Sequence, residues 1–324
     1  MRRVVCREFG PVTDLDLVEE PDPVPGPGEV LVEVLACGVS FVDGLIVRGE
    51  YQIRPPRPFT PGSVVAGRVV ACGPGVGDLR VGDRVAGLAF LCGAYASHTV
   101  VAASALRRLP ASVSVETAAT AIESYATMLF AFTRRTTVAR GDWVVVLGAG
   151  GGIGLAAVDL ARSMGGRVLA VASTPAKRMA ARGAGAEAAL DPADGDLKTG
   201  IRDATGGGAD VVVDPVGGAL AEPALRALRR FGRYLVIGFA SGRIPALPLN
   251  QVLLNNRSVI GVDWGAWSAG EPEDNGRLIE DLLGRLARAE LVPPEPARHP
   301  LSEAPRVLSE LHGRRAVGKL VLIP

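Results

Sequence analysis

The chain has 324 residues, of which 48% are hydrophobic, and a formal net charge of +1. This length predicts about two domains, and the near-neutral charge provides neither the basic stripe of a nucleic-acid-binding protein nor a polybasic membrane anchor. No apolar stretch has the length of a membrane span, and the chain starts directly in a strand-like pattern, which argues against a signal peptide.

The first third of the chain, to about residue 120, is rich in Pro, Gly and short valine-rich runs. The strands expected here lie at residues 29–39, 63–73, 83–89 and 95–103. Short strands punctuated by turn residues predict a β-rich, barrel-like domain.

The cysteines and histidines of the chain are few and scattered. Cys6, Cys37, Cys72 and Cys92 include no pair at C-x-x-C spacing, and the three histidines stand at ligand spacing neither from one another nor from a cysteine. We therefore expect buried free thiols in a reducing cytoplasm, and no metal centre.

A glycine-rich turn follows the next predicted strand. The segment from Trp143 to Gly154 reads WVVVLGAGGGIG, and an amphipathic helical pattern follows over residues 153–165. Gly151 would let the backbone approach a phosphate, and Gly154 would let the helix pack tightly on the strand. Ala149 occupies the first position of the usual G-x-G-x-x-G pattern. The turn predicts a dinucleotide site, with the pyrophosphate at the helix N-terminus, against the alternative of a plain strand-to-helix turn.

The end of the second strand of this region bears on which dinucleotide binds. A site that prefers NAD places an acid there to accept hydrogen bonds from the ribose. In this chain the strand ends at Ala172, and Ser173 and Thr174 follow. Lys177 and Arg178 then stand on the next predicted helix. Small hydroxyl residues and a cation suit a 2′-phosphate, so NADPH is favoured over NADH, although the two cations could simply solvate a surface helix.

Apolar strands alternate with helical segments between about residues 124 and 262. The six strands expected are residues 143–147, 167–172, 186–190, 209–214, 233–239 and 258–262. Strands separated by helical crossovers predict a doubly wound parallel sheet.

The C-terminal part of the chain is expected to return to the first domain and complete it. Its predicted elements are helices at residues 275–291 and 304–314 and a strand at residues 319–324. The expected domains are therefore residues 1–123 completed by 264–324, and residues 124–263.

The chain resembles the zinc-free medium-chain dehydrogenases/reductases, close to the NADPH:quinone oxidoreductases of the ζ-crystallin-like branch. The matching segments are PGPGEVLVEV, PFTPGSVVAG, VGDRVAG, VLGAGGGIG, VVVDPVGG, LVIGFASG, AVGKLVL and the D-x-x-x-x-R-x-G-x-Y run from Asp43 to Tyr51. The resemblance implies an α/β fold with a GroES-like, β-barrel-type catalytic domain and a Rossmann domain with a six-stranded, doubly wound parallel sheet. It also implies a homodimer formed through the edge strand at residues 258–262.

The zinc-dependent relatives carry a ligand cysteine where this chain has Ser40, and a His-Glu pair where it has Ser63 and Val64. The resemblance thus implies hydride transfer without a Lewis acid, to an acceptor that already delocalises charge, such as a quinone or an activated enone. Ser40 also replaces an asparagine usual in the quinone reductases, and Val64 replaces a common glutamate, which leaves the preferred acceptor open.

Three residues are expected to serve the transfer of hydride from nicotinamide C4 in the interdomain cleft. Tyr51 would hydrogen-bond the acceptor oxygen, Thr127 would contact the nicotinamide, and Ser40 would complete the polar set. Each has a plainer alternative. Tyr51 could be a ring that closes the barrel, Thr127 could bond the backbone of its own helix, and Ser40 could be only a turn residue. Glu123 is either an acid with a perturbed pKa or a helix-surface carboxylate.

The expected cofactor contacts lie at the glycine turn, at the carboxyl ends of the following strands and near the C-terminus, with Lys319 and Thr127 implied by the resemblance. They are Thr127, Gly151, Gly152, Ile153, Gly154, Ser173, Thr174, Lys177, Val216, Gly217, Gly238, Phe239, Ala240 and Lys319. Ligands of open α/β sheets bind at this carboxyl edge.

The function expected is NADPH-dependent reduction of a small-molecule quinone by a cytoplasmic enzyme, with no nucleic-acid or membrane partner. A 2-enoyl-thioester reductase is the nearest alternative, since it shares the fold and the cofactor but needs a proton donor for the α-carbon. A second alternative is an NADPH-binding protein retained for a structural or sensing role.

Overall fold

The computed structural model describes residues 1–89 and 93–324. The chain divides into two compact units. The first unit comprises Met1–Glu123, Pro272–Arg288 and Glu295–Pro324, and the second comprises Ser124–Glu271 and Ala289–Pro294.

The first unit is built on a mainly antiparallel, seven-stranded sheet with the order β14-β15-β3-β4-β5-β7, in which β6 also pairs with β3. Its strands are β3 (Glu29–Val39), β4 (Val64–Cys72), β5 (Arg84–Leu88), β6 (His98–Ala102), β7 (Leu106–Arg108), β14 (Ala297–Pro300) and β15 (Leu320–Ile323). All four strands predicted before residue 120 are present. The C-terminal strand β15 pairs antiparallel with β3 and parallel with β14.

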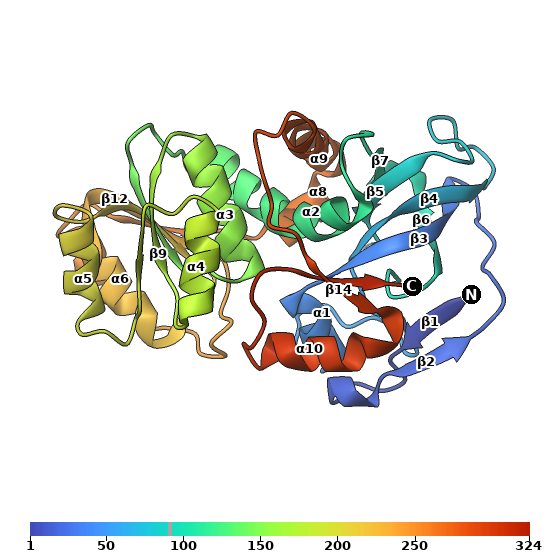
Figure 1. The fold of residues 1–324 in the computed structure, drawn as a ribbon, viewed down its shortest axis with the longest axis horizontal. Coiled ribbons are helices and arrows are strands. Elements are labelled where there is room, and N and C mark those ends of the chain that lie inside the picture. The colour runs from blue at the N-terminus through green and yellow to red at the C-terminus, as the bar shows by residue number, and fades with distance from the viewer. Residues whose placement is uncertain (90–92) are drawn as a thin grey trace. The chain divides into compact units, whose positions relative to one another are not determined.

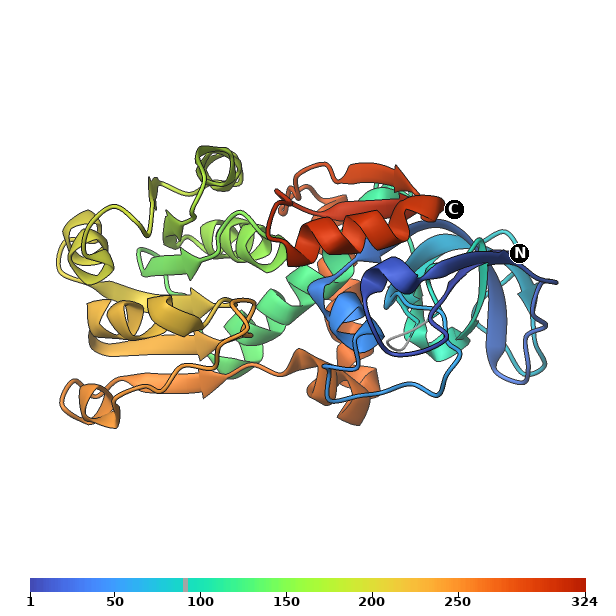
Figure 2. The same cartoon turned by 90° about the horizontal axis from the view of Figure 1, so that it is seen from below.

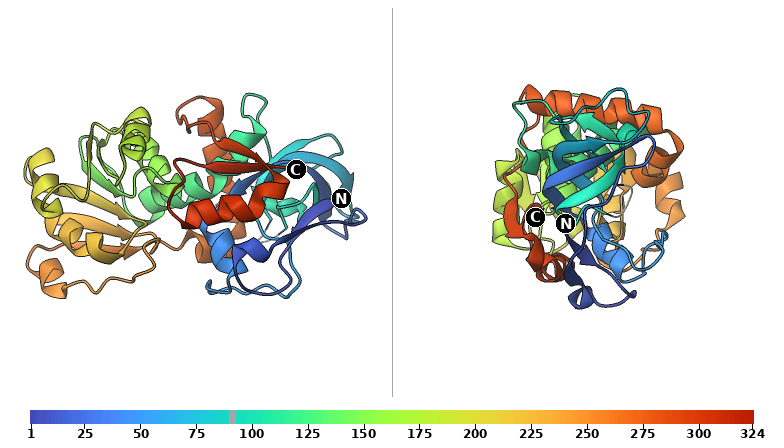
Figure 3. Two further views of the ribbon diagram at one scale, coloured as in Figure 1. Left: turned by 60° about the horizontal axis from the view of Figure 1, so that its bottom comes forward. Right: turned by 90° about the vertical axis from the view of Figure 1, so that its right-hand side faces the viewer.

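The core of the first unit lies against this sheet. Val30, Val32 and Val34 alternate along β3 and are buried, as expected of β-branched residues on one face of a strand. The apolar face of α10 (Ala304–His312) adds Val307 and Leu308, both fully buried. In Figures 1 and 3 this helix lies beside α1 (Phe41–Val47), which it contacts.

The remaining elements of the first unit are short, apart from two helices. They are β1 (Arg2–Val5), β2 (Asp16–Glu19), the 3₁₀ turns η1 (Val12–Asp14), η2 (Ala103–Ala105) and η5 (Leu301–Glu303), α9 (Pro272–Ala287), and the first part of α2 (Val115–Phe130). The helix predicted at residues 275–291 is α9, which begins and ends a few residues earlier. Pro272 explains this start, because proline suits the first helical position and acidic residues follow it.

The second unit contains a six-stranded, entirely parallel sheet with the order β10-β9-β8-β11-β12-β13. Its strands are β8 (Trp143–Leu147), β9 (Arg167–Val171), β10 (Ala188–Leu190), β11 (Ala209–Asp214), β12 (Leu228–Val236) and β13 (Ser258–Gly261). The doubly wound sheet predicted from the alternation of strands and helices is confirmed. Every residue of the central strand β8 is buried, as in a sheet covered on both faces.

Helices cover both faces of this sheet. Besides the second part of α2, the helices of this unit are α3 (Gly152–Ser163), α4 (Pro175–Gly183), α5 (Leu197–Ala204), α6 (Ala221–Ala227), α7 (Leu249–Leu253) and α8 (Trp264–Gly270), with the π-helical turn η3 (Ala131–Arg135) and the 3₁₀ turn η4 (Gly218–Leu220). Figure 1 shows α3 and α4 on one side of β9 and β12, and α5 and α6 on the other. Within the described part of the chain, no helix combines the length and apolar character needed to cross a membrane.

Two segments near the C-terminal part belong to the second unit, although the sequence places residues 264–324 in the first domain. Residues 264–271 carry Trp267, whose ring stacks on Phe130 with 4.8 Å between centroids. Residues 289–294 carry Val292, whose N–H donates to the buried Asp159 carboxylate at 2.7 Å. Neither contact can be predicted from the hydrophobic periodicity of the sequence.

The cysteines depart from the expectation at one position. Cys6 and Cys37 are buried free thiols, as expected, and burial raises the pKa of each. Cys72 is exposed because it is the last residue of β4, so the expectation of a buried thiol is wrong there. Cys92 lies outside the described residues.

Candidate functional site

The glycine turn of the second unit joins β8 to α3, with Gly151 as the N-cap of the helix. A Cβ on Gly154 would lie 2.4 Å from the carbonyl oxygen of Gly148 and 2.6 Å from Cα of Ala149, so only glycine allows α3 to pack this closely. A Cβ on Gly151 would meet nothing nearer than 3.5 Å. The packing predicted for Gly154 is present, and the backbone at Gly151 is open to an approaching group.

The start of α4 lies directly against this turn. Thr174 is the N-cap of α4, and its hydroxyl accepts a hydrogen bond from the N–H of Lys177 at 3.3 Å. A Cβ on Gly150 would lie only 2.4 Å from Cβ of Lys177, so the lysine stem packs on the glycine turn. The start of α4, with Thr174 as its N-cap, is therefore held against the glycine turn through Lys177. That Ser173, Thr174 and Lys177 share one ligand stays a prediction.

Arg178, the second cation of this region, forms hydrogen bonds within the second unit. Its guanidinium donates to the carbonyl of Ala172 at 2.8 Å and to the carboxylate of Asp191 at 2.5 Å. A backbone hydrogen bond from Ala193 and the contact with Arg178 lower the pKa of Asp191. Of the two cations that follow β9, Arg178 is thus held in an ion pair within the unit.

A buried carboxylate shapes the loop after β11. Asp214 accepts hydrogen bonds from the N–H groups of Val216 and Gly217, both at 2.8 Å, and from the hydroxyl of Tyr234 at 2.5 Å. Gly217 has φ of 66°, and a Cβ there would lie 2.9 Å from the ring of Phe239. Asp214 and the glycine together hold this loop against the one that follows β12.

The ends of three strands consequently meet at one edge of the sheet. The N–H of Ala240 donates to the carbonyl of Pro215 at 3.1 Å, and that of Ser241 donates to Val216 at 2.9 Å. On the other side, a Cβ on Gly148 would lie 2.7 Å from the side chain of Val216. The glycine turn, Val216 and the loop at residues 238–240, all predicted as cofactor contacts, are brought together.

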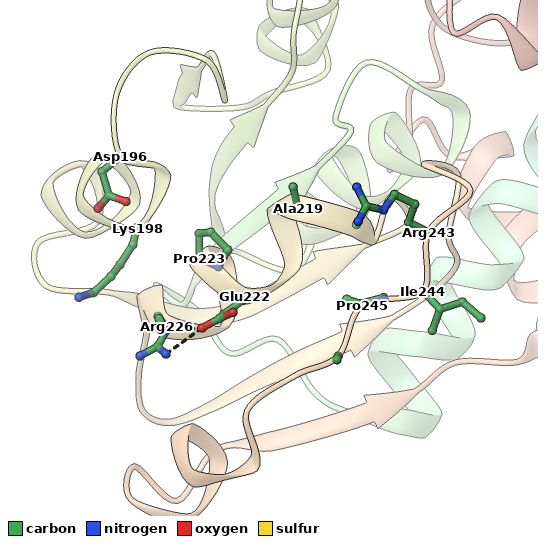
Figure 4. A pocket seen from close by; sticks show the side chains of 11 residues that line it. Asp196, Lys198, Ala219, Glu222, Pro223, Arg226, Arg243, Ile244 and Pro245 are labelled. Carbon is green, nitrogen blue, oxygen red and sulfur yellow. Dashed lines mark hydrogen bonds and ion pairs between the residues drawn. The ribbon is translucent and has the colours of Figure 1, made fainter.

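A surface pocket of about 580 Å³ lies on the same unit, lined in part by α5, α6 and the loop at residues 243–246 (Figure 4). Three of its charged side chains have partners within the unit. Glu222 and Arg226 form an ion pair at 2.7 Å, and Asp196 caps α5 by accepting from the N–H of Thr199 at 2.9 Å. This pocket is separate from the glycine turn, and we assign it no ligand.

The first unit carries a buried polar cluster centred on Asp43, which is 1% exposed. Ser40 is the N-cap of α1: its hydroxyl accepts from the N–H of Asp43 at 3.2 Å, and its own N–H donates to the Asp43 carboxylate at 2.8 Å. The same carboxylate accepts from the hydroxyls of Ser63 at 3.0 Å and Tyr95 at 2.9 Å. Burial raises the pKa of Asp43, while these hydrogen bonds act in the opposite direction.

The positions that hold zinc ligands in the zinc-dependent relatives do not fit a metal ion in this chain. The hydroxyls of Ser40 and Ser63 are engaged with Asp43, and Val64 is a buried alkyl side chain on β4. Over residues 1–89 and 93–324, no three His, Cys, Asp or Glu side chains gather as a metal site would require.

Glu123 extends the polar cluster from α2. Its carboxylate lies 3.8 Å from Nζ of Lys319, and the two side chains are 21% and 17% exposed, so Glu123 is not a helix-surface carboxylate. Burial raises the pKa of Glu123, and the charge of Asp43 adds to this effect, whereas Lys319 and a hydrogen bond from Ser40 lower it. Lys319, expected near the cofactor, therefore also faces a carboxylate of its own unit.

The other two residues expected to act in hydride transfer lie in different units. Tyr51 is half-buried and packs against the core of the first unit, which fits its plainer reading as a ring that closes the barrel. Thr127 is nearly buried on the part of α2 that belongs to the second unit. Their roles toward an acceptor and a nicotinamide stay predictions.

Sequence reasoning assigned no role to three of the groups that organise these sites: Asp43, Tyr95 and Asp214. Asp43 stands three residues after Ser40, which is the spacing of a capping box, and Asp214 ends an apolar strand just before a Pro-Val-Gly-Gly turn. Both patterns can be read in the sequence and could have identified these two aspartates. Tyr95 carries no comparable signal, because only the fold brings it to Asp43.

Comparison with known proteins agrees with this architecture. Residues 26–111 match the family described as the alcohol dehydrogenase GroES-like domain, and residues 152–280 match the family described as zinc-binding dehydrogenase. Quinone oxidoreductase-like protein 2 from Rattus norvegicus is 33% identical over 99% of this chain and 91% of its own length.

Solved structures with the same fold cover the chain from end to end. Escherichia coli quinone oxidoreductase complexed with NADPH has a TM-score of 0.91 at 28% identity, covering 100% of both chains. A mycobacterial protein complexed with NADPH has a TM-score of 0.92 at 30% identity, also covering 100% of both chains. This chain therefore belongs to the quinone oxidoreductase family of the medium-chain dehydrogenase/reductase superfamily, and it is an oxidoreductase of that superfamily.

Proposed function

We propose that this protein binds NADPH and transfers hydride from it to a quinone without a metal ion. The observation that carries the proposal is the edge of the second unit's sheet, where the open turn at Gly151 adjoins the start of α4. Lys177 packs on that turn, and Ala172 follows β9 at the position where an NAD site would place an acid. The family members solved with NADPH support the choice of cofactor.

The residues at this edge fit a dinucleotide. NADPH supplies the hydride when it is bound. The backbone from Gly151 to Gly154, including Gly152 and Ile153, would face the pyrophosphate with the free N–H groups of α3. Ser173, Thr174 and Lys177 would hold the 2′-phosphate. Val216 and the loop of Gly238, Phe239 and Ala240 would line the rest of the cofactor at the same edge.

The side chains of the first unit support transfer without zinc. The hydroxyls of Ser40 and Ser63 belong to a buried hydrogen-bond network, and Val64 is an apolar residue of β4. We therefore propose that no Lewis acid polarises the acceptor at these positions. A quinone suits such a site because its own ring delocalises the incoming charge. Tyr51 and Ser40 would donate hydrogen bonds to the acceptor oxygen, and Thr127 would hold the nicotinamide.

The assay that tests this proposal compares acceptors and cofactors on one preparation. Oxidation of NADPH and of NADH is followed with 1,4-benzoquinone and, separately, with crotonyl-CoA as a 2-enoyl thioester. We expect quinone turnover, with kcat/KM higher for NADPH than for NADH. Turnover of crotonyl-CoA without quinone turnover would favour the enoyl-thioester reductase instead. NADPH binding without turnover of either acceptor would favour a structural or sensing role.

We also propose that the protein is a homodimer formed through β13. This strand is at the end of the strand order, and Figure 2 shows it with α7 at the edge of the second unit's sheet. Val259 on β13 is 40% exposed, and Leu249 and Leu253 on α7 are 75% and 76% exposed. An edge strand beside exposed leucines is the surface that a two-fold related copy would cover. Light scattering should give a dimer for the parent protein and a monomer for Leu253→Lys, and a monomeric parent would contradict the proposal.

The buried thiols Cys6 and Cys37 agree with a reducing compartment, and we propose a cytoplasmic location on that basis. Fractionation of cells that express a tagged chain would test it. Recovery of the chain outside the cytoplasmic fraction would contradict this proposal without affecting the proposed activity.

A further inference from the structure

An acid stands beside the position that would distinguish NADH from NADPH, although it comes from a different strand. β10 pairs in parallel with β9, with Leu190 opposite Val171, so Asp191 follows β10 where Ala172 follows β9. The N–H of Ala172 donates to the carbonyl of Leu190 at 3.1 Å, which continues the pairing to this point. Asp191 is therefore the neighbour, one strand over, of the residue that stands where an NAD site would place an acid.

One nitrogen of Arg178 joins these two neighbours. Nη1 of Arg178 donates to the carbonyl oxygen of Ala172 at 2.8 Å and to Oδ2 of Asp191 at 2.5 Å. The other carboxylate oxygen of Asp191 accepts from the N–H of Ala193 at 3.0 Å. The side chains of Arg178 and Asp191 are 23% and 17% exposed, so solvent screens this ion pair less than one on the open surface.

The ion pair compensates a negative charge that would act on the cofactor. The backbone hydrogen bond from Ala193 and the contact with Arg178 lower the pKa of Asp191, so its carboxylate is ionised at neutral pH. An ionised carboxylate at this edge repels a 2′-phosphate, and it can accept hydrogen bonds from the ribose hydroxyls of NADH. Arg178 offsets the charge and occupies the carboxylate with its own donor.

The segment that contains Asp191 has no cation of its own. Residues 191–197 read DPADGDL, with three aspartates and neither lysine nor arginine. Asp196 is the N-cap of α5 and accepts from the N–H of Thr199, whereas Asp191 is joined through Arg178 to the backbone of Ala172. Without Arg178, this segment would present only negative side chains beside the carboxyl end of β9.

We propose that the Arg178–Asp191 ion pair determines the preference for NADPH, because Asp191 by itself would favour NADH and Arg178 neutralises it. Arg178 acts through Asp191 and does not have to contact the phosphate. The inference rests on the proposed NADPH-dependent function and adds a specificity-determining pair to the contacts proposed there, with Lys177 as the cation that meets the 2′-phosphate.

The experiment measures Kd for NADPH and for NADH by titration calorimetry in the parent, Arg178→Met, Asp191→Asn and the double variant. We expect Arg178→Met to raise Kd for NADPH about tenfold, because the uncompensated carboxylate repels the 2′-phosphate, and to leave Kd for NADH equal or lower. Asp191→Asn removes that charge, so the double variant should return Kd for NADPH to within about threefold of the parent value. Asp191→Asn alone should keep the preference for NADPH.

Arg167→Met is the matched control. Arg167 also forms an ion pair from β9, with Glu187 just before β10, but at the amino ends of these strands. This variant should leave the ratio of the two Kd values at the parent value, because the carboxylate that it uncovers lies at the opposite edge of the sheet. A change in the ratio as large as that for Arg178→Met would overturn the inference.

Two further outcomes would overturn the inference alone. Weak NADPH binding in Arg178→Met that Asp191→Asn does not rescue would mean that Arg178 contacts the phosphate directly. An equal rise in Kd for NADPH and NADH would assign Arg178 to the packing of the Ala172 backbone. A parent protein that binds neither cofactor would refute the proposed function, and the inference with it. If Arg178→Met does not fold, Arg178→Gln decides by the same criteria, because its amide is uncharged but still has a donor for the Ala172 carbonyl.

Discussion

The carboxyl edge of the second unit's sheet and the polar cluster of the first unit are built in opposite ways. At the edge, backbone groups dominate, and the glycines at 148, 150 and 154 leave no room for a Cβ. In the cluster, side chains dominate: Ser63, Tyr95 and Ser40 converge on Asp43. We expect one added carbon atom to disrupt the edge, which is built from backbone. We expect the change of one polar atom to disrupt the cluster, which is built from side chains.

The largest effect that this comparison predicts is for Gly154→Val. The new Cβ would lie 2.4 Å from the carbonyl oxygen of Gly148, which is backbone and cannot turn away. We expect NADPH binding to be lost and the free energy of unfolding to fall by about 3 kcal/mol, as for an overpacked core. Calorimetry with and without NADPH measures both quantities.

Gly183→Ala is the control for this variant. Gly183 lies on α4, where a Cβ would meet nothing within 4 Å, so the change should leave NADPH binding intact and stability equal or slightly higher. Normal NADPH affinity in Gly154→Val would show that the edge is less dependent on backbone packing than we infer.

The second effect concerns the side-chain cluster. In Asp43→Asn, one carboxylate oxygen becomes an NH₂ group that faces hydroxyl and N–H donors, so buried donors lose their acceptor. We expect a loss of about 2 to 3 kcal/mol in the free energy of unfolding, measured by denaturant titration. Asp16→Asn is the matched control, because Asp16 forms only an exposed ion pair with Arg7 and should cost less than about 1 kcal/mol. An equal loss in the free energy of unfolding for the two variants would contradict the inference that the polar cluster depends on single polar atoms.

A third effect should make the first unit sensitive to acid. The ring of His312 lies against that of Phe41, with 4.2 Å between centroids and a tilt of 33°, and its Nδ1 accepts from Arg48 at 3.0 Å. Burial, aided by the Arg48 charge, lowers the pKa of His312 to about 4. Between the ordinary value of 6.5 and about 4, the unfolded chain binds a proton that the folded chain does not. Stability is therefore present at neutral pH and is lost as the pH falls through this window.

From pH 7 to pH 5 this linkage amounts to about 2 kcal/mol in the free energy of unfolding. Denaturant titrations at the two pH values should show it in the parent, and His312→Gln should flatten this part of the pH dependence. The same slope in both proteins would mean that other groups cause the acid sensitivity.

The smallest effect tests the one charged side chain that we propose as a contact of the 2′-phosphate. Lys177→Met should raise Kd for NADPH about tenfold, or about 1.4 kcal/mol, and should leave Kd for NADH nearly unchanged, because only NADPH carries the 2′-phosphate. Titration calorimetry measures both constants. Arg182→Met, at an exposed position in the last turn of α4, should change neither. An equal loss for NADPH and NADH would assign Lys177 to the packing of the turn instead.

The two regions also differ in how far they could be predicted. The sheet of the second unit and the adjacency of the glycine turn to the start of α4 follow from the order of strands and helices, since parallel strands bring their carboxyl ends to one edge. The pairing of Arg178 with Asp191 could not be predicted, because Asp191 lies on a neighbouring strand end. The exposure of Cys72 and the membership of residues 264–271 in the second unit also depend on contacts that local periodicity does not report.

By itself, the sequence determined the parallel sheet, the glycine turn and the polar residues beside it, because strand and helix periods and the steric demand for glycine are local properties. Only the tertiary structure decided that Ser40, Ser63 and Tyr95 bond to one buried aspartate, and that Lys319 faces Glu123. These residues come from five separate segments of the chain, and only the folded first unit brings their side chains within hydrogen-bonding and ion-pairing distance of one another. Whether a carboxyl group such as Glu123 can keep a proton is then set by its burial and its neighbours, and both are properties of the fold.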